Sequence, residues 1–202
     1  MILLKMAILD FVTVGTLIRA LQIELDIYPT FDTFGPETMR RFPGLRRQSP
    51  EEEPTNLNYI LQGGFWCKGY DPGGFSGIFF VATEETVKRF QRDVGVDPTG
   101  EVNGKEMKAI LNTDGFRLSN IDGRDRVRTV QQALNYRYSN YFDYIPTNGI
   151  FDRQTNRALI YALQHEIGLG HIANGTFGPS TIGNCPTLIP ENAPQVLTAI
   201  LQ

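Results

Sequence analysis

The chain repeats itself with a period of about seventy residues, and this repetition limits the fold more than any other feature of the sequence. Glutamines that follow a hydrophobic residue recur in two registers of this period. The registers are Gln22, Gln91 and Gln164 in one and Gln62, Gln131 and Gln202 in the other. A Phe-Gly-Pro-x-Thr string repeats in the same way, from Phe34 and from Phe177. The 202 residues are therefore expected to form about three small units instead of one or two ordinary domains.

Each unit is expected to be a bundle of short helices joined by glycine-rich loops. The clearest copy runs from about Asn56 to Thr113, and a turn-forming loop from Gly69 to Gly74 follows its first helix. Val87, Phe90 and Val94 lie at helical spacing in the second helix and predict one buried face. The predicted fold class is all-α, in tandem three-helix bundles. The helices are expected near residues 12–26, 56–68, 83–94, 103–112, 124–139, 153–168 and 193–201.

A Gly-x-Phe-x-x-x-Thr string marks the start of a helix in each complete unit. It occurs from Gly77 to Thr83 and from Gly149 to Thr155. Glycine allows the turn before the helix, and the phenylalanine, Phe79 or Phe151, is expected to enter the core. Asp152 stands where a helix cap is needed. The string therefore indicates a structural helix start and not a catalytic loop.

The repeats divide the chain into four parts joined by polar linkers at 48–54 and 119–123. These parts are a partial repeat at 1–47, complete repeats at 56–115 and 124–186, and the opening of a further repeat at 187–202. The first part matches only from its second helix onward, and the last stops within its first helix. We therefore expect a segment of a longer repeat protein, or a chain derived from one by truncation. Residues 187–202 should pack on an earlier unit, be poorly ordered or mediate self-association.

The apolar run at residues 1–18 is not expected to be a signal peptide or a membrane anchor. Lys5 and Asp10 interrupt it, and no small-residue cleavage site follows. Its uninterrupted part is shorter than the ~20 residues that a membrane helix requires. From Phe11 the spacing of apolar residues is that of an amphipathic helix, so we predict a core-facing helix and no membrane span.

The segment from Leu61 to Gln91 resembles the peptidoglycan-binding module of bacterial and phage cell-wall hydrolases. It joins Leu-Gln, Gly-Tyr, Gly-x-Phe, Thr, Val and Phe-Gln at the spacings of that family. The unit from Arg124 to Pro186 is similar in a looser form. Ser76 and Phe80 depart from the pattern, because the family usually has an acidic residue or glycine there. Such repeats also resemble those attached to a glycoside-hydrolase-like barrel in secreted Gram-positive proteins, and no such barrel is recognised in this sequence.

The resemblance implies that each complete unit binds peptidoglycan, through its glycan or its stem peptide, and holds an enzyme at the wall. Aromatic residues near the loops are candidate platforms for the ligand. The candidate binding residues are Trp66, Tyr70, Asp71, Phe75, Tyr144 and Asn148, with Tyr141 and Phe142 beside them. For Trp66, Phe79 and Phe151 the alternative is burial in the core. For Tyr70 and Tyr144 the sequence does not decide between a binding groove and the core. Replacing a groove-lining Tyr70 by Ala should weaken wall binding more than stability.

No catalytic residue, metal site or cofactor is predicted. His165 and His171 lie six positions apart, which is not the His-Glu-x-x-His spacing of a zinc hydrolase. Cys67 and Cys185 occupy non-equivalent places in the repeat, and no pair of carboxylates suits a glycosidase. Nucleic acid is not expected as a partner, because 19 Lys and Arg against 22 Asp and Glu give a net charge of −3.

The favoured function is a non-catalytic peptidoglycan-binding array, extracellular or in the cell wall of a bacterium, or in a phage lysin. A fused or associated catalytic domain is a further expected partner. Two alternatives stay open. One is a peptidoglycan hydrolase of glycosidase or amidase type with unrecognised catalytic residues, and the other is a helical protein-interaction module.

Overall fold

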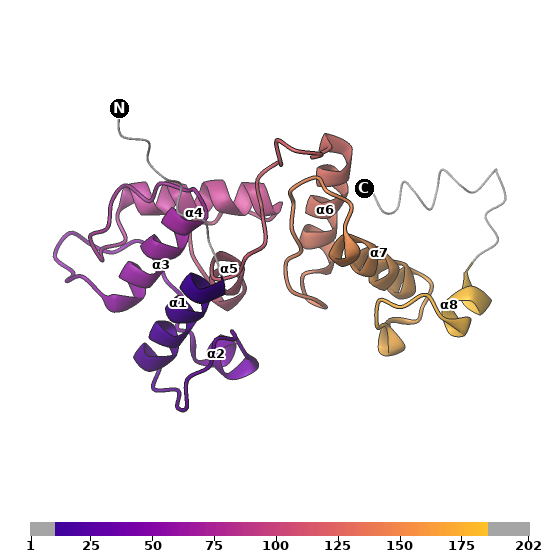
Figure 1. Cartoon of the computed structure of the whole chain (residues 1–202), viewed down its shortest axis with the longest axis horizontal. Helices are drawn as coiled ribbons and strands as arrows, with labels where there is room; N and C mark the ends of the chain where they lie inside the picture. The colour runs from indigo at the N-terminus through magenta and orange to yellow at the C-terminus, as the bar shows by residue number, and fades with distance from the viewer. Residues whose placement is uncertain (1–10, 186–202) are drawn as a thin grey trace. The chain divides into compact units, whose positions relative to one another are not determined.

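The computed structural model describes residues 11–185, and the regular secondary structure of this part is helical (Figure 1). The helices are α1 (Phe11–Glu24), α2 (Pro36–Arg41), α3 (Asn56–Cys67), α4 (Val81–Val94), α5 (Gly104–Ile110), α6 (Asp125–Tyr138), α7 (Arg153–Glu166) and α8 (Pro179–Asn184), with a 3-10 turn η1 (Gly170–Ile172). Within these residues, β-type pairing is confined to an isolated antiparallel bridge between Leu45 and Val102. The all-α prediction is confirmed for the described part of the chain.

Six predicted helices are present, with both ends within about two residues of the expected positions. The helices α2 and α8 lie outside the predicted ranges, and each has six residues. Both begin at the proline of a Phe-Gly-Pro-x-Thr string, where the missing N–H of proline leaves no hydrogen bond unmade. The helix predicted at 193–201 lies outside the described residues. The grouping of helices into three-helix bundles stays a prediction.

Side-chain caps explain where three of the helices begin. Thr55 accepts a hydrogen bond from the Asn58 backbone N–H at the start of α3. Asn103 and Glu106 form a capping box at α5, in which each side chain accepts from the other residue's backbone N–H. At α7 the carboxylate of Asp152 accepts from the Thr155 backbone N–H at 2.8 Å, which confirms the predicted cap.

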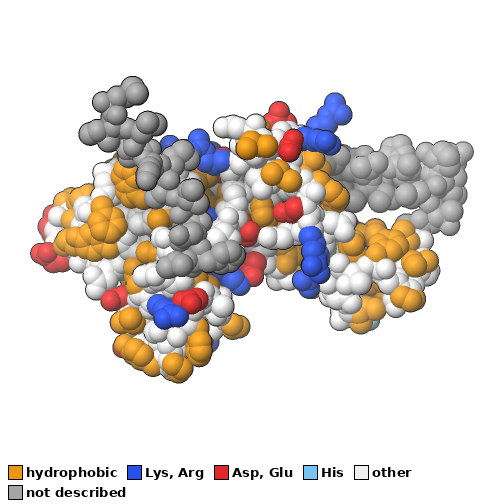
Figure 2. Space-filling view, in the orientation of Figure 1, with side chains coloured by type: hydrophobic (Ala, Val, Ile, Leu, Met, Phe, Trp, Pro, Cys, Tyr) orange, Lys and Arg blue, Asp and Glu red, His pale blue; other side chains and the backbone are white. Residues whose placement is uncertain are grey.

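The chain divides into two compact units, which are described separately. The first unit contains residues 11–93 and 97–114 of the described chain, and the second contains 94–96 and 115–185. In the first unit α1 packs against α3, α2 against α5, and α3 against α5, whereas in the second α6 packs against α7. On the face drawn in Figure 2, basic and acidic side chains are interspersed, and hydrophobic side chains show in separate patches. The described residues on this face therefore form no broad field of one charge sign.

An aromatic cluster forms the centre of the first unit. Phe65, Tyr70 and Phe90 are each at most 3% exposed. Their ring centroids lie 5.7–6.0 Å apart in edge-to-face arrangements. Such geometry is favourable because the positive edge of one ring meets the negative face of the next. The predicted buried face of the second helix is confirmed, since Val87, Phe90 and Val94 are fully buried.

The two Gly-x-Phe strings place their phenylalanines differently. Phe79 is fully buried, as predicted, whereas Phe151 is 60% exposed, so the prediction of a core residue is wrong for Phe151. The backbone of Phe79 is paired with Gln48: the Gln48 N–H donates to the Phe79 carbonyl at 2.9 Å, and the Phe79 N–H donates to Gln48 Oε1 at 2.8 Å. Burial at this position therefore depends on a neighbouring segment and not on the string alone.

Five buried glutamines make the same set of hydrogen bonds, which we call the glutamine clamps. They are Gln22, Gln62, Gln91, Gln131 and Gln164, each at most 4% exposed. Each side-chain carbonyl accepts from a backbone N–H of the following loop at 2.7–3.0 Å. Each side-chain amide donates at 2.8–3.0 Å to a loop carbonyl, which belongs in turn to Thr33, Ile78, Glu101, Ile150 and Thr176. Within the described residues, the glutamines of both sequence registers therefore make the same kind of contact, and the clamp recurs at about half of the seventy-residue period.

Four of the five clamps are completed by the threonine that starts the next helix. The glutamine amide donates to its hydroxyl at 2.9–3.4 Å, and these residues are Thr38, Thr83, Thr155 and Thr181. In the fifth clamp the corresponding residue is Glu106, which caps its own helix instead. The threonine of the sequence motif thus ties the end of one helix to the beginning of the next.

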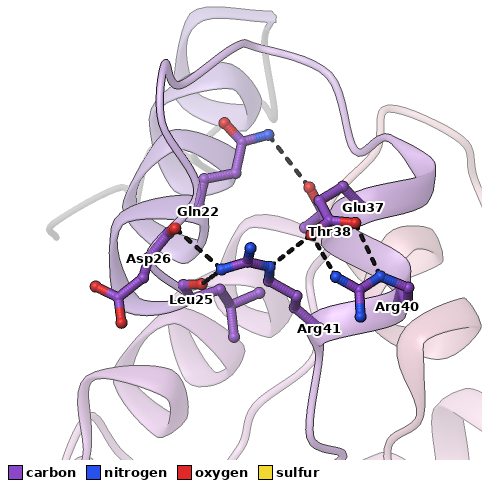
Figure 3. A network of polar contacts seen from close by, with 7 residues as sticks. All are labelled: Gln22, Leu25, Asp26, Glu37, Thr38, Arg40 and Arg41. Atoms are coloured by element: carbon purple, nitrogen blue, oxygen red, sulfur yellow. Dashed lines mark hydrogen bonds and ion pairs between the residues drawn. The ribbon is translucent and has the colours of Figure 1, made fainter.

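A second polar network joins the end of α1 to α2 (Figure 3). Arg41 donates to the backbone carbonyls of Leu25 and Asp26 at 3.2 and 3.1 Å, just after α1 ends. Glu37 accepts from both Arg41 and Arg40 at 2.6 Å. These two guanidinium groups lower the pKa of the Glu37 carboxyl to about 2 from its ordinary 4.5. The network therefore holds in place the arginine that covers the two carbonyls directly after α1.

Glu37 is therefore expected to make the first unit less stable in acid. Because its pKa in the folded protein lies below the ordinary value, its contribution is present above about pH 4.5 and is lost as the pH falls towards 2. The stability difference between the wild type and Glu37→Gln should narrow over this range, and it should also narrow in high salt because the pair is exposed. Urea unfolding followed by Trp66 fluorescence at several pH values measures this. Parallel pH profiles for the two proteins would rule the contribution out.

Candidate ligand-binding pocket

The loop residues predicted to bind ligand in the first unit fall into two groups. Trp66 and Phe75 are 47% and 62% exposed, so their rings are accessible. The Phe75 ring lies 4.9 Å from that of Tyr59. Asp71 is exposed, and its carboxylate accepts from the Gly73 backbone N–H at 2.9 Å, which shapes the turn. For Trp66, Phe75 and Asp71 a binding role stays a prediction.

Tyr70 belongs to the core and not to a groove. It is 3% exposed, and its ring packs edge-on against Phe65 and Phe90. Its hydroxyl donates to the Asp93 carboxylate at 2.8 Å. The left-handed Gly69, with φ of 76°, turns the chain so that the Tyr70 N–H donates to the Phe65 carbonyl and the ring enters the core. A Tyr70→Ala change would therefore remove core packing, so it cannot serve as a test of wall binding.

Tyr70→Phe isolates the polar end of this side chain. The change keeps the buried ring and removes the hydrogen bond to Asp93, so the free energy of unfolding should fall by about 1–2 kcal/mol. Sedimentation with peptidoglycan should be unchanged. Chemical denaturation and a pull-down on the same protein preparation measure both quantities. A loss of wall binding without a loss of stability would restore Tyr70 as a ligand residue.

The predicted residues of the second unit are also divided by burial. Tyr144 is 9% exposed and does not present a ring to a ligand. Asn148 shapes its loop, because its side chain accepts from the Ile150 backbone N–H at 3.0 Å and its backbone carbonyl accepts from the Ser119 N–H at 2.9 Å. Tyr141 is 52% exposed and Phe142 is partly buried. Of these three aromatic residues, Tyr141 and Phe142 thus have rings that a ligand can reach.

Tyr141 and Phe142 line a pocket of about 450 Å³, which we call the aromatic pocket. Its walls come from the loop after α6 and from one face of α7. The lining residues are Tyr141, Phe142, Asp143, Ile145, Gln154, Arg157, Ala158 and Tyr161. The α7 residues were missed by the sequence reasoning, although Gln154, Arg157 and Tyr161 recur at the three- and four-residue spacing of one helix face. The pocket volume lies within the range of about 300–1,000 Å³ found for small-molecule sites.

Packing among the side chains of this region fixes the positions of the rings. Phe142 meets Tyr161 edge-on with centroids 5.9 Å apart. The imidazole of His165 lies 3.9 Å from the Tyr141 ring and 5.2 Å from the Tyr161 ring. Its Nε2 atom is buried and makes no hydrogen bond within the described chain. The imidazole therefore acts here as a flat packing surface that holds two tyrosines in place.

Behind the pocket, a hydrogen bond joins the end of α6 to the end of α7. The Tyr138 hydroxyl donates to the Glu166 carboxylate at 2.6 Å. Burial, together with this bond, raises the pKa of the Tyr138 hydroxyl. Tyr138 also belongs to the small core of the unit, with Leu134, Ile145, Ala158 and Ala162. Ile145 and Ala158, which line the pocket, thus belong to a core that this hydrogen bond helps to hold together.

The first unit has a hollow of about 530 Å³ beside the Leu45–Val102 bridge. The two backbones of the bridge exchange N–H to carbonyl hydrogen bonds of 2.8 Å in both directions. The hollow is lined by Pro43, Gly44, Leu45, Arg46, Thr99, Glu101, Val102 and Asn103, none of them aromatic. It differs from the aromatic pocket in having aliphatic, polar and charged walls without an aromatic ring.

Other chemically distinctive side chains serve the structure. Lys68 at the end of α3 donates to the backbone carbonyls of Asn112 and Asp114 at 3.0 and 2.7 Å, and burial lowers the pKa of its ammonium group to about 7. Cys67 and Cys185 are not joined in a disulfide. Among residues 11–185 there is no group of three or more His, Cys, Asp or Glu side chains arranged to hold a metal ion. The same residues include no helix with the length and hydropathy required to cross a membrane.

Two segments of the chain match known protein families. Residues 59–110 match the family described as "Putative peptidoglycan binding domain". Residues 120–186, which include the whole aromatic pocket, match the family described as "FadG/YbfG, PGDB-like domain". The chain contains peptidoglycan-binding-like domains. The predicted resemblance to a peptidoglycan-binding family is thereby confirmed for these two segments, and association with the cell wall is supported.

Two curated relatives from Bacillus subtilis (strain 168) cover most of the chain. It is 46% identical over 192 residues to "Uncharacterized protein YbfG", an alignment that includes 94% of this chain and 26% of the relative. It is 42% identical over 181 residues to "Uncharacterized protein FadG", with 87% of this chain and 31% of the relative included. The peptidoglycan-binding-like chain thus spans about a quarter to a third of the length of these relatives. No solved structure gives a significant match.

Proposed function

We propose that the chain is a non-catalytic peptidoglycan-binding array that belongs to, or derives from, a secreted bacterial wall hydrolase. The observation that carries the proposal is that the family match and the pocket fall on the same residues. Residues 120–186 match a peptidoglycan-binding-like family, and they include every residue that lines the aromatic pocket. A second match at residues 59–110 provides another domain of related type. Two linked binding domains increase the retention of a protein on a polymeric wall, because release requires both to detach at once.

A catalytic domain fits the proposal as a partner outside this chain. The curated relatives are three to four times as long as the segment they share with it, which leaves room in such proteins for further domains. In this proposal the protein acts at the cell wall outside the membrane. The array supplies affinity for the wall, and the partner domain supplies the chemistry.

Co-sedimentation with purified insoluble peptidoglycan, run beside a turbidity assay for wall lysis, tests this function. The chain should sediment with peptidoglycan and leave the turbidity of the suspension unchanged. Cellulose serves as a control polysaccharide that lacks N-acetyl groups and peptides. Lysis by the purified chain would favour a hydrolase with unrecognised catalytic residues. If the chain neither sediments with peptidoglycan nor lyses it, a protein-interaction module is favoured.

Exposed apolar side chains on the second unit are the observation in favour of the interaction module. Phe151, Phe177 and Ile182 are 50–62% exposed. A protein partner that covers these side chains would remove their apolar surface from water. Sedimentation equilibrium of the chain at several concentrations separates self-association from wall binding.

A further inference from the structure

We infer that the aromatic pocket is a saccharide site that binds the N-acetylated glycan strand of peptidoglycan, and that the charged face of α4 at the corresponding positions of the first unit does not take this saccharide. This inference rests on the proposed wall-binding function and specifies both the domain and the chemical part of the ligand. It follows from a comparison of the same structural positions in the two units.

The glutamine clamps establish which positions correspond. Gln91 lies in the last turn of α4 and accepts a hydrogen bond from the Gly100 N–H of the following loop. Gln164 lies in the last turn of α7 and accepts from the Gly175 N–H in the same way. The residue seven positions before each glutamine lies against that glycine. A Cβ atom at Gly100 would come within 2.9 Å of Glu84 Cγ, and one at Gly175 within 2.5 Å of Arg157 Cγ.

The two helices therefore present comparable faces, in which Glu84 corresponds to Arg157. By the same count, Lys88 of α4 corresponds to Tyr161 of α7. Both glycines have φ near +70 to +80°, a left-handed conformation that other residues rarely adopt. Glycine at 175 thus both forms the loop and leaves room for the stem of Arg157 beside the pocket.

The corresponding face of α4 is occupied by charged pairs. Lys88 Nζ lies 2.7 Å from Glu84 and 3.1 Å from Glu85, and Arg47 approaches Glu84 at 3.6 Å. These side chains neutralise one another's charges through ion pairs, and none of them presents an aromatic ring to a ligand. The face of α7 has instead Tyr161 and Arg157, which line the aromatic pocket with Tyr141 and Phe142.

A pocket with three aromatic rings and a few polar groups suits a sugar better than a peptide stem. One face of a pyranose ring consists of C–H groups that pack on an aromatic face, while hydroxyl and N-acetyl groups at its edge need polar partners. Asp143, Gln154 and Arg157 supply such partners at the walls. A stem peptide carries several carboxylates, and the pocket contains a single cationic side chain, Arg157.

The arrangement of the rings also favours binding at little entropic cost. His165 contacts the Tyr141 and Tyr161 rings in tilted arrangements, with centroids 3.9 and 5.2 Å away, and Phe142 meets Tyr161 edge-on. Rings that are already held in place lose little freedom when a ligand arrives. The first unit offers exposed rings at Trp66 and Phe75, but on α4 the charged pair of Glu84 and Lys88 stands where α7 has Arg157 and Tyr161.

Calorimetric titration of the full chain tests the inference with two soluble probes. The first is the β-1,4-linked tetramer of N-acetylglucosamine, and the second is a synthetic peptidoglycan stem pentapeptide. The wild type should bind the tetramer, and Tyr161→Ala should weaken this binding about tenfold through the loss of one stacking ring. Tyr161→Phe should keep most of the affinity. Lys88→Ala, the matched change in the first unit, should bind the tetramer like the wild type.

The outcomes distinguish this inference from the proposed function. Unchanged tetramer binding by both Tyr161→Ala and Arg157→Gln would overturn the assignment of the pocket, and circular dichroism confirms that each variant is folded. Binding of the pentapeptide in place of the tetramer would overturn the saccharide specificity. If the wild type and Tyr161→Ala sediment equally with peptidoglycan, the inference fails and wall binding stands. If the wild type binds the tetramer but does not sediment with the wall, the saccharide site stands and the proposed function fails.

Discussion

Replacing Phe90 by Ala is expected to lower the free energy of unfolding of the first unit by about 3–5 kcal/mol. Phe90 is fully buried, and its ring lies 5.8 Å from that of Phe65 and 5.7 Å from that of Tyr70. Removing it takes away the favourable transfer of a large apolar group and leaves a cavity that two fixed rings cannot fill. A small domain with a total stability of about 5–15 kcal/mol would lose a large fraction of it.

Urea unfolding followed by fluorescence measures this loss in the unit concerned, because Trp66, the single tryptophan of the chain, lies in α3 of that unit. Phe75→Ala is the matched control. Its ring is 62% exposed, so the same chemical change should cost less than about 1 kcal/mol. Equal losses for the two variants would show that Phe90 is not a central core residue.

Gln131→Leu is expected to destabilise the second unit by about 3 kcal/mol. Gln131 is fully buried, accepts from the Gly149 N–H at 2.9 Å and donates to the Ile150 carbonyl and the Thr155 hydroxyl at 2.9 Å. Leucine has a similar size but no hydrogen-bonding group, so these loop groups lose their partner. Each buried polar group left without a partner costs about 1–3 kcal/mol.

Gln62→Leu removes the corresponding clamp of the first unit, from Ser76, Gly77 and Ile78, and therefore provides a crossed control. It should shift the transition that Trp66 reports, whereas Gln131→Leu should leave this transition in place. Hydrogen exchange of the Gly149 amide should accelerate in Gln131→Leu. An unchanged exchange rate and an unchanged unfolding transition would show that the clamp does not stabilise the loop.

The sequence by itself determined the local structure of this protein. Helical spacing at Val87, Phe90 and Val94 predicted a buried face because such spacing places side chains on one side of a helix. Asp152 predicted a cap because its carboxylate reaches backbone N–H groups three residues ahead. The recurring glutamines predicted the repeat. These features depend on residues that are near one another along the chain, or on a pattern that recurs several times in the sequence.

Only the tertiary structure decided which aromatic residues are core and which can meet a ligand. Phe79 and Phe151 have the same local motif, yet a distant segment at Gln48 pairs with the first, and the second is exposed. Tyr70 lies in a glycine-rich loop, where a ligand-binding residue could be expected, but the turn at Gly69 directs its ring into the core. Tyr161 belongs to none of the recurring sequence motifs. It lines a pocket because the loop after α6, which contains Tyr141, folds against α7. Burial is set by contacts between residues far apart in sequence, so no local pattern contains it.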